Sequence, residues 1–388
     1  MALKARLARV WMISSPLVYL FSLALLAAVI ALVEQKSASK FFRFVPSFVL
    51  IYLFSMSLAS FGVFEKNEAI DAVYSNTKQN LLPAMLFLML LQVDIRDFFK
   101  LGKPLLVAYL LALLSLSFGF IFISFVFDFN AETASAFGAL SGSWMGGVAN
   151  MVAVGSALGV SQEAFGYALI VDSVNYTIWI MFLLFLTPFA HRFNTFTASH
   201  EQIAKLSEIG CACTIGAKRY WLLILLSIVV AFAVNLIASS GIVLLNYTTT
   251  TVVLATLLGV LGSFTRLKEL NGSSEVATSM LYMLIALIGS KAVFENFSGV
   301  GVLVFAGFCI LLIHAIIMVV GAKIFKLDLF SIAIASLSNI GGVASASILA
   351  ATYNKALVGV GVLMAVMGYL VGTFGGLAVG NILVWMAK

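Results

Sequence analysis

Two short motifs in this sequence combine a pair of glycines with asparagine and serine, inside segments that are otherwise apolar. The first runs over residues 142–150 and the second over residues 338–345. Adjacent glycines weaken a helix by roughly 1 kcal/mol each relative to alanine. Backbone groups freed in lipid need partners from protein or water, and paired breaks in two halves of a chain mark the binding site of many transporters. The motifs therefore predict two interrupted helices whose breaks share one polar site.

Broken helices inside a membrane can bind charged solutes through their exposed ends. The N-terminus of a half-helix carries about half a positive elementary charge, which suits an anionic group, and unwound carbonyls suit Na⁺. Tight packing through small residues would explain one glycine pair, but two copies, each with an asparagine, favour a site. The residues expected to bind the solute are Ser141, Ser143, Gly146, Gly147, Ser338, Gly341, Gly342 and Ser345.

Asp172 lies in the middle of the apolar segment that follows the first motif. An ionisable side chain there costs at least about 2.5 kcal/mol on insertion scales and is functional by default. It could bind Na⁺ or load and release a proton; a structural hydrogen-bond anchor is the alternative. The residues expected to manage the coupling cation are Asp172, Ser173, Asn175, Asn150 and Asn339.

Three further ionisable residues could line the solute pathway. Asp94 and Lys291 occupy equivalent positions near the ends of matched apolar segments. They could form a buried pair or reach the headgroups from the interface. His314, within an apolar segment, could relay protons, although a hydrogen-bonded histidine of the core is the favoured interpretation. No cofactor is expected, and no metal other than the coupling ion.

The elements that position these residues must be membrane helices. Of 388 residues, 62% are hydrophobic and 10% charged, which excludes a soluble protein. A crossing takes about 20 apolar residues, and helices are required because an open sheet edge cannot face lipid. The apolar segments expected to cross are 12–33, 46–63, 81–95, 104–127, 133–158, 163–187, 220–240, 249–264, 276–290, 300–322, 329–351 and 357–386.

Other functional classes find little support. The net charge of +6 comes from Lys and Arg scattered between apolar segments, as membrane loops require, with no basic run interleaved with aromatics. Nucleic-acid binding is therefore excluded. Residues 142–146 have the spacing of a nucleophile elbow, but that motif needs a strand, a turn and a helix in an α/β fold. Without a phosphate-binding loop, neither an enzyme nor an ATP-driven pump is expected.

The chain divides into two halves. Residues 1–187 form a first repeat with an extra N-terminal helix, 188–218 a polar linker and 219–388 a second repeat. The loops rich in Lys and Arg are shifted by one loop in the second half relative to the first. Because such loops lie on the cytoplasmic side, the two halves should cross the membrane in opposite directions, as inverted repeats do. Matched segments lie six apolar segments apart along the chain, however, whereas inversion requires an odd number of membrane crossings from one to the other. The sequence therefore predicts a miscounted segment, in 12–33 or 188–245.

The chain resembles a family of bacterial and plastid membrane proteins known as domain of unknown function 819. The motifs that carry the resemblance are 81–94, 146–150, 171–172, 338–342, 367–369 and 372–373. That family is similar to the cation/proton antiporter and anion transporter superfamily, which includes bile acid:sodium and glutamate:sodium symporters. The resemblance implies a panel or dimerisation domain, a homodimer, and a core with crossed, discontinuous helices at 133–158 and 329–351. It also implies that Asp172 is the coupling acid.

This sequence departs from the family pattern at two positions. Val343 replaces the usual proline after the second glycine pair, and Ser173 replaces the usual asparagine after the acid. The first departure could soften the second break, and the other could alter the cation site.

The sequence thus predicts an all-α polytopic membrane protein with inverted repeats, multi-pass in the bacterial inner membrane. The expected function is secondary active transport of a small organic, anionic solute by alternating access, driven by Na⁺ or H⁺. A cation/proton antiporter without organic cargo is one alternative. A membrane receptor or scaffold is another.

Overall fold

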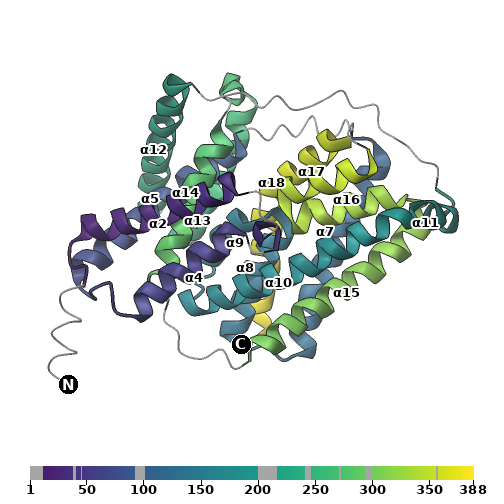
Figure 1. The fold of residues 1–388 in the computed structure, drawn as a ribbon, viewed down its shortest axis with the longest axis horizontal. Coiled ribbons are helices and arrows are strands. Elements are labelled where there is room, and N and C mark those ends of the chain that lie inside the picture. Colours follow the sequence, from purple (N-terminus) through teal and green to yellow (C-terminus); the bar gives the residue numbers. More distant parts are fainter. Residues whose placement is uncertain are drawn as a thin grey trace.

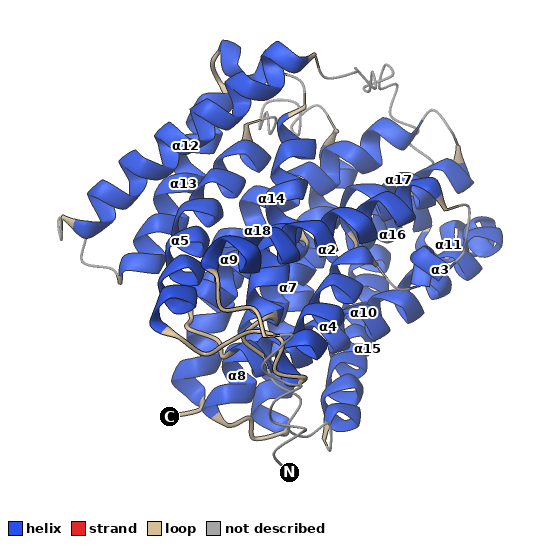
Figure 2. Ribbon diagram, turned by 60° about the vertical axis from the view of Figure 1, so that its left-hand side comes forward, coloured by secondary structure: helices blue, strands red, loops and turns tan. Residues whose placement is uncertain are grey.

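The computed structural model describes residues 12–37, 41–44, 46–91, 101–199, 216–240, 246–270, 272–292, 299–354 and 357–388. The regular elements in these ranges are helices (Figure 2). Six candidate membrane spans stand out by length and hydropathy, which confirms an all-α polytopic membrane protein. They contain α2 (Pro16–Lys36), α7 (Lys103–Val126), α10 (Gln162–Leu186), α12 (Ala217–Ser239), α15 (Val300–Phe325) and α18 (Val358–Met386).

The helices form two groups that lie side by side (Figure 1). The panel group contains α2, α12 and four others: α4 (Ser47–Ser60), α5 (Glu68–Leu90), α13 (Tyr247–Ser263) and α14 (Ser273–Gly289). The core group contains α7, α10, α15 and α18 with four shorter helices: α8 (Ala131–Gly146), α9 (Val148–Ala157), α16 (Leu329–Ile340) and α17 (Gly342–Tyr353). Each half of the sequence therefore contributes helices to both groups.

Helix α5 begins well before the apolar segment predicted from residue 81. Asn67 caps it by accepting a hydrogen bond from the Ile70 amide at 2.8 Å, and the first half of the helix is polar, including Asp71 and Lys78. A search for apolar segments misses such a polar half. Side-chain caps likewise start α8, α10 and α16, at Asn130, Ser161 and Asp328.

Helices α8 and α9 fold back on each other as a re-entrant hairpin. A Cβ atom on Gly142 would lie 2.9 Å from the carbonyl oxygen of Asn150, and one on Gly155 would lie 3.2 Å from the Cβ of Ala139. Ser161, which follows α9, donates a hydrogen bond of 2.9 Å to Glu132 in the first turn of α8. The chain thus leaves the membrane on the side from which it entered.

Helices α16 and α17 form the second hairpin. The rings of Phe330 near the start of α16 and Tyr353 at the end of α17 lie 5.2 Å apart. The prediction that 133–158 and 329–351 each cross the bilayer as crossed, discontinuous helices is therefore wrong. Both segments are interrupted at the glycine pairs, but there the chain turns back.

The two hairpins also explain how the number of crossings between matched helices can be odd. Helices α7 and α15, which precede them, are antiparallel neighbours: the rings of Phe127 and Phe305 lie 6.3 Å apart, and Leu111 packs against Gly321. The hairpins consequently enter from opposite ends of the bundle. Because a hairpin adds no crossing, an odd number of crossings separates matched helices, as inversion requires. The miscount lay in the hairpins, and the prediction that it lay in 12–33 or 188–245 is wrong.

A stripe of glycines joins the first hairpin to α18. A Cβ on Gly138 would lie 2.9 Å from the Cα of Gly380, and a Cβ on Gly376 would lie 2.6 Å from the Cα of Gly142. Small residues at this four-residue spacing allow membrane helices to pack backbone against backbone. The sequence carries the signal in two runs, Gly138, Gly142 and Gly146 on α8 and Gly368, Gly372, Gly376 and Gly380 on α18.

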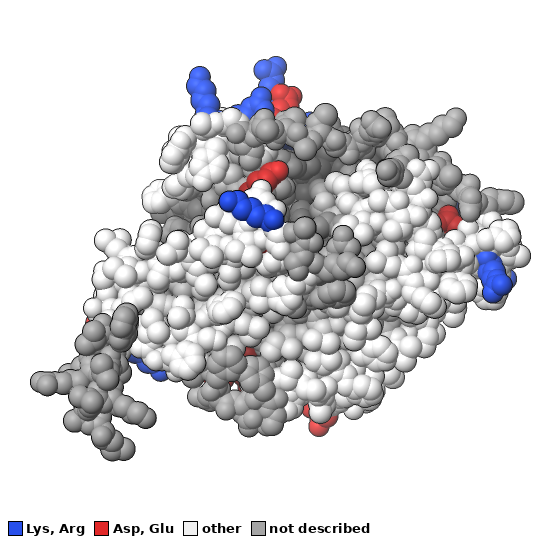
Figure 3. All heavy atoms as spheres, in the orientation of Figure 1, with Lys and Arg blue, Asp and Glu red and all other residues white. Residues whose placement is uncertain are grey.

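Charged side chains gather at the ends of the bundle. In Figure 3 most of the visible Lys and Arg atoms lie near the upper and right-hand edges, around a broad area that is nearly free of charge. The topology brings one set of cations to the same end, at the start of α12, after α13 and at the end of α15: Lys218, Arg219, Arg266, Lys268, Lys323 and Lys326. This distribution leaves an apolar belt that suits a lipid bilayer.

Candidate functional site

The tips of the two hairpins meet at one glycine of α18. A Cβ on Gly368 would lie 3.1 Å from the Cα of Gly146 and 3.7 Å from the carbonyl oxygen of Ser338. Gly147, with φ +85° and ψ 172°, turns the first tip, and Gly342, with φ +70°, turns the second. Other residues rarely adopt these conformations. Each tip presents the N-terminus of a helix, α9 or α17, to the shared region.

Asp172 on α10 contacts the first tip. It is 4% exposed and accepts hydrogen bonds from the indole Nε1 of Trp144 at 2.7 Å and from the hydroxyl of Ser143 at 3.3 Å. No Lys, Arg or His in the described part of the chain forms an ion pair with it. A buried carboxyl without a basic partner is a candidate site for a proton or a cation.

Tyr176, one turn further along α10, contacts the second tip. Its hydroxyl hydrogen-bonds with Ser345, and a Cβ on Gly341 would lie 2.7 Å from its Cε2 atom. Helix α10 thus touches one hairpin through Asp172 and the other through Tyr176. Tyr176 is absent from the site residues predicted from the sequence, although its place four residues after the acid puts both side chains on one helix face.

Asn150 anchors the first hairpin to α18. Its Nδ2 donates to the carbonyl oxygens of Gly146 at 2.9 Å and Gly368 at 3.1 Å, and its Oδ1 accepts from Thr373 at 2.6 Å. Donor and acceptor groups of the amide are both engaged in these bonds. This arrangement favours a positioning role over the predicted cation ligation.

The second tip carries two buried polar atoms that have no hydrogen-bond partner in the described ranges. Ser338 and Asn339 are both 0% exposed. The Nδ2 of Asn339 donates to the Ala335 carbonyl at 2.9 Å, but its Oδ1 and the Ser338 hydroxyl oxygen have no hydrogen-bond partner among the described residues. Leaving a buried polar atom unsatisfied costs about 1–3 kcal/mol. These two atoms are therefore candidates for binding a solute or a cation.

Other predicted site residues face away from the tips or support them. The Ser141 hydroxyl donates to the carbonyl oxygens of Gly138 and Gly376, within the glycine contact between α8 and α18. Asn175 donates to the carbonyl of Val304 on α15 at 3.1 Å. Ser173 is buried beside Asp172.

Two of the three predicted pathway residues, Lys291 and His314, bond to partners other than Asp172. Lys291 forms an ion pair with the exposed Asp71 of α5, which agrees with the interfacial alternative. His314 hydrogen-bonds with Ser115 at 2.6 Å and Ser336 at 2.8 Å, as a core histidine does. Asp94 lies outside the described residues.

A polar pocket that was not predicted from the sequence lies between α5, α10 and α13. Its cavity volume is about 220 Å³, and Lys78 lines it beside Tyr74 and Tyr247. No acidic residue in the described ranges pairs with Lys78. The remaining lining residues are Ser75, Gln79, Leu82, Gln162, Thr248 and Thr251. The pocket lies where α5 and α13 of the panel group meet the start of α10.

Comparison with known proteins gives a family but no function. A family model described as "Protein of unknown function (DUF819)" matches residues 21–386. No curated protein matches the chain.

Proposed function

Because the chain belongs to the DUF819 family, whose description states no function, we propose from its geometry that it is a secondary active transporter. It moves a small organic, anionic solute by alternating access, driven by Na⁺ or H⁺. The observation that carries the proposal is that two oppositely inserted hairpins meet at Gly368, with Asp172 hydrogen-bonded to the first tip. Paired helix breaks of this kind form the binding sites of many secondary transporters.

The site supplies groups for two ligands. The N-termini of α9 and α17 carry partial positive charge and suit an anionic group of the solute. Asp172 takes the coupling cation or proton. The oxygens of Ser338 and Asn339, which have no partner in the part of the chain that the structure describes, complete the polar surface. Movement of the core group against the panel group would expose this site to each side in turn.

The pocket lined by Lys78 supports the proposal that the solute is anionic. A lysine without an acidic partner, next to tyrosine hydroxyls and glutamine amides, suits a carboxylate or phosphate. Its position at the seam between the two helix groups makes it a first contact for solute on the way to the tips. We expect Lys78→Gln to raise the KM for the solute about tenfold, equivalent to about 1.4 kcal/mol.

The charge distribution favours one orientation. Short loops rich in Lys and Arg lie on the cytoplasmic side, so the end that carries Arg266 and Lys326 faces the cytoplasm. The second hairpin, which follows α15, then enters from the cytoplasm, and the first enters from outside. We place the protein in the bacterial inner membrane, as a homodimer through the panel group.

A cation/proton antiporter without organic cargo is the second candidate. The observation that favours it is Asp172, a buried acid that no basic residue neutralises among the described residues. A receptor or scaffold needs no such acid. Thermal-shift assays with a metabolite library, with and without Na⁺, separate the candidates. A solute that stabilises the protein more in Na⁺ or at low pH supports cargo transport, whereas an antiporter responds to the ion alone.

Asp172→Asn tests the coupling. The wild-type melting temperature should rise with Na⁺ or with protons, by an amount equivalent to about 2.7 kcal/mol at one hundred times the dissociation constant. Asp172→Asn should lose this response. Asp328→Asn is the matched control, because Asp328 is also buried but caps α16, and asparagine caps equally well. Indifference of the wild type to both ions would exclude coupled transport.

A further inference from the structure

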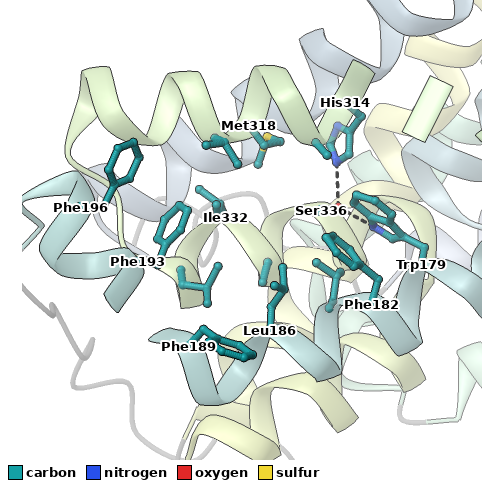
Figure 4. A pocket seen from close by; sticks show the side chains of 15 residues that line it. Trp179, Phe182, Leu186, Phe189, Phe193, Phe196, His314, Met318, Ile332 and Ser336 are labelled. Atoms are coloured by element: carbon teal, nitrogen blue, oxygen red, sulfur yellow. Dashed lines mark hydrogen bonds between the residues drawn. The ribbon is translucent and has the colours of Figure 1, made fainter. Parts of the chain in front are cut away.

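A second, apolar pocket lies between α10, α15, α16 and the short helix α11 (Ala190–Thr197) (Figure 4). Its cavity volume is about 330 Å³, at the lower end of the range for small-molecule sites. The side chains of Phe182, Leu186 and Met318 form its walls. Because α10 and α15 are membrane spans, this pocket lies within the apolar belt.

The polar groups at the inner end of this pocket bond to one another. Ser336 hydrogen-bonds with His314 at 2.8 Å and accepts from the Trp179 indole at 2.9 Å, as Figure 4 shows. His314 bonds on its other side to Ser115. With these groups mutually satisfied, the pocket offers an occupant mainly hydrocarbon contact. Apolar cavities of this kind favour apolar ligands over water.

The outer end of the pocket carries positive charge. Phe193 and Phe196 of α11 line it, and Arg192 on the same helix is exposed. Lys323 of α15 donates a hydrogen bond to the Phe196 carbonyl, and its Nζ lies 4.7 Å from the centre of the Phe196 ring. Basic groups beside an apolar pocket between spans suit the headgroup of an anionic lipid, and this pocket lies at the end of the bundle that the proposed orientation assigns to the cytoplasm.

We propose that this pocket binds one acyl chain of an anionic phospholipid, with the phosphate held by Lys323 and Arg192. The acyl chain lies between α10 and α15 and contacts Ile332 on α16, the first helix of the second hairpin. The occupant follows from the location in the apolar belt, the apolar walls and the cationic rim. This proposal is independent of the transported solute.

Quenching of Trp179 fluorescence by brominated acyl chains tests the site. The protein is reconstituted in phosphatidylglycerol with brominated chains, and the Trp179 signal is the difference between wild type and Trp179→Phe. Trp179 is only 6% exposed, whereas Trp221 and Trp385 are 66% and 74% exposed and serve as lipid-facing references. We expect at least twofold quenching of Trp179. Unquenched Trp179 beside quenched references would overturn the proposal.

Two variants separate the pocket from the surrounding lipid. Ala315 lines the pocket, so Ala315→Phe fills it and should restore Trp179 emission, leaving the reference tryptophans quenched. Quenching that survives in this variant would show that the chain lies elsewhere. Lys323→Gln combined with Arg192→Gln should make brominated phosphatidylglycerol no better a quencher than brominated phosphatidylcholine. Equal quenching by the two lipids in the wild type would overturn the headgroup site.

Discussion

The two re-entrant hairpins occupy matching positions in the two halves, and different side chains hold them. In the first, Trp144 and Ser143 bond to Asp172, and Asn150 bonds to α18. In the second, Ser345 bonds to Tyr176. Where the first tip has Ser143 and Trp144, the second has Ser338 and Asn339, whose oxygens lack hydrogen-bond partners among the described residues. The first tip is thus held by hydrogen bonds within the protein, whereas the second carries the two oxygens that we propose as ligand-binding atoms.

The difference between the two tips follows from α18, which takes the place in the second half that α10 takes in the first. Helix α10 places an acid against the first tip, whereas α18 places Gly368 against both tips. The glycine allows close approach but offers no side chain to satisfy Ser338 or Asn339. An inverted repeat can therefore assign anchoring to one copy and ligand binding to the other. We expect the second hairpin to respond to solute and the first to be needed for folding.

We expect the largest difference in stability between the two hairpins when the first glycine of each pair is replaced. A Cβ on Gly146 would clash with the backbone of Gly368, whereas a Cβ on Gly341 meets the movable side chains of Ser345 and Tyr176. Gly146→Ala should therefore destabilise by about 3 kcal/mol or more, and Gly341→Ala by about 1 kcal/mol. Thermal unfolding in detergent measures both. Equal melting temperatures for the two variants would contradict the backbone contact at Gly368.

The two asparagines should separate stability from binding. Asn150→Ala leaves Thr373 and the Gly368 carbonyl without their partner and should cost about 2–3 kcal/mol. Asn339→Ala removes only a bond to its own helix, so it should cost less than about 1 kcal/mol. It should nevertheless weaken solute-dependent thermal stabilisation about tenfold in apparent affinity. A variant at Asn339 that binds solute normally would remove it from the site.

Much of the fold follows from the sequence. The apolar segments predicted the helices of both halves, because burial in lipid requires long apolar runs. The polar half of α5 was missed for the same reason. The glycine pairs predicted the interruptions but not the hairpins, because a helix break does not show whether the chain continues or turns back. The positive φ of Gly147 and Gly342 and the glycine contacts between α8 and α18 depend on tertiary packing.

The candidate site could be predicted only in part. The sequence predicted that Asp172 and the two glycine pairs would share one region. Gly368 contacts both tips, and Asp172 bonds to the first tip. It did not separate Asn150 from Asn339, because the same residue type anchors one tip and leaves an oxygen partnerless at the other. Nor did it predict that Asn175 would face α15. The direction of a side chain on a buried helix depends on its neighbours, which one sequence does not reveal.

We expect the smallest difference between the two hairpins when the hydroxyl groups that hold their tips are removed. Thr373 is 0% exposed and donates to Asn150 at 2.6 Å, so Thr373→Val leaves a buried acceptor unsatisfied and should cost about 1–3 kcal/mol. Tyr176 is only partly buried, so Tyr176→Phe should cost about 0.5 kcal/mol, because water can replace the lost bond to Ser345.

Hydrogen exchange gives the sharper measurement for this pair. Tyr176→Phe should speed amide exchange in residues 342–353 and leave residues 148–157 unchanged, because α10 holds the second tip through this hydroxyl. Thr373→Val should do the reverse. The tyrosine ring, which packs against Gly341, remains in Tyr176→Phe, so any change reports the hydrogen bond alone. If both variants loosened both hairpins equally, the tips would move as one unit, and the division into an anchored and a responsive hairpin would be wrong.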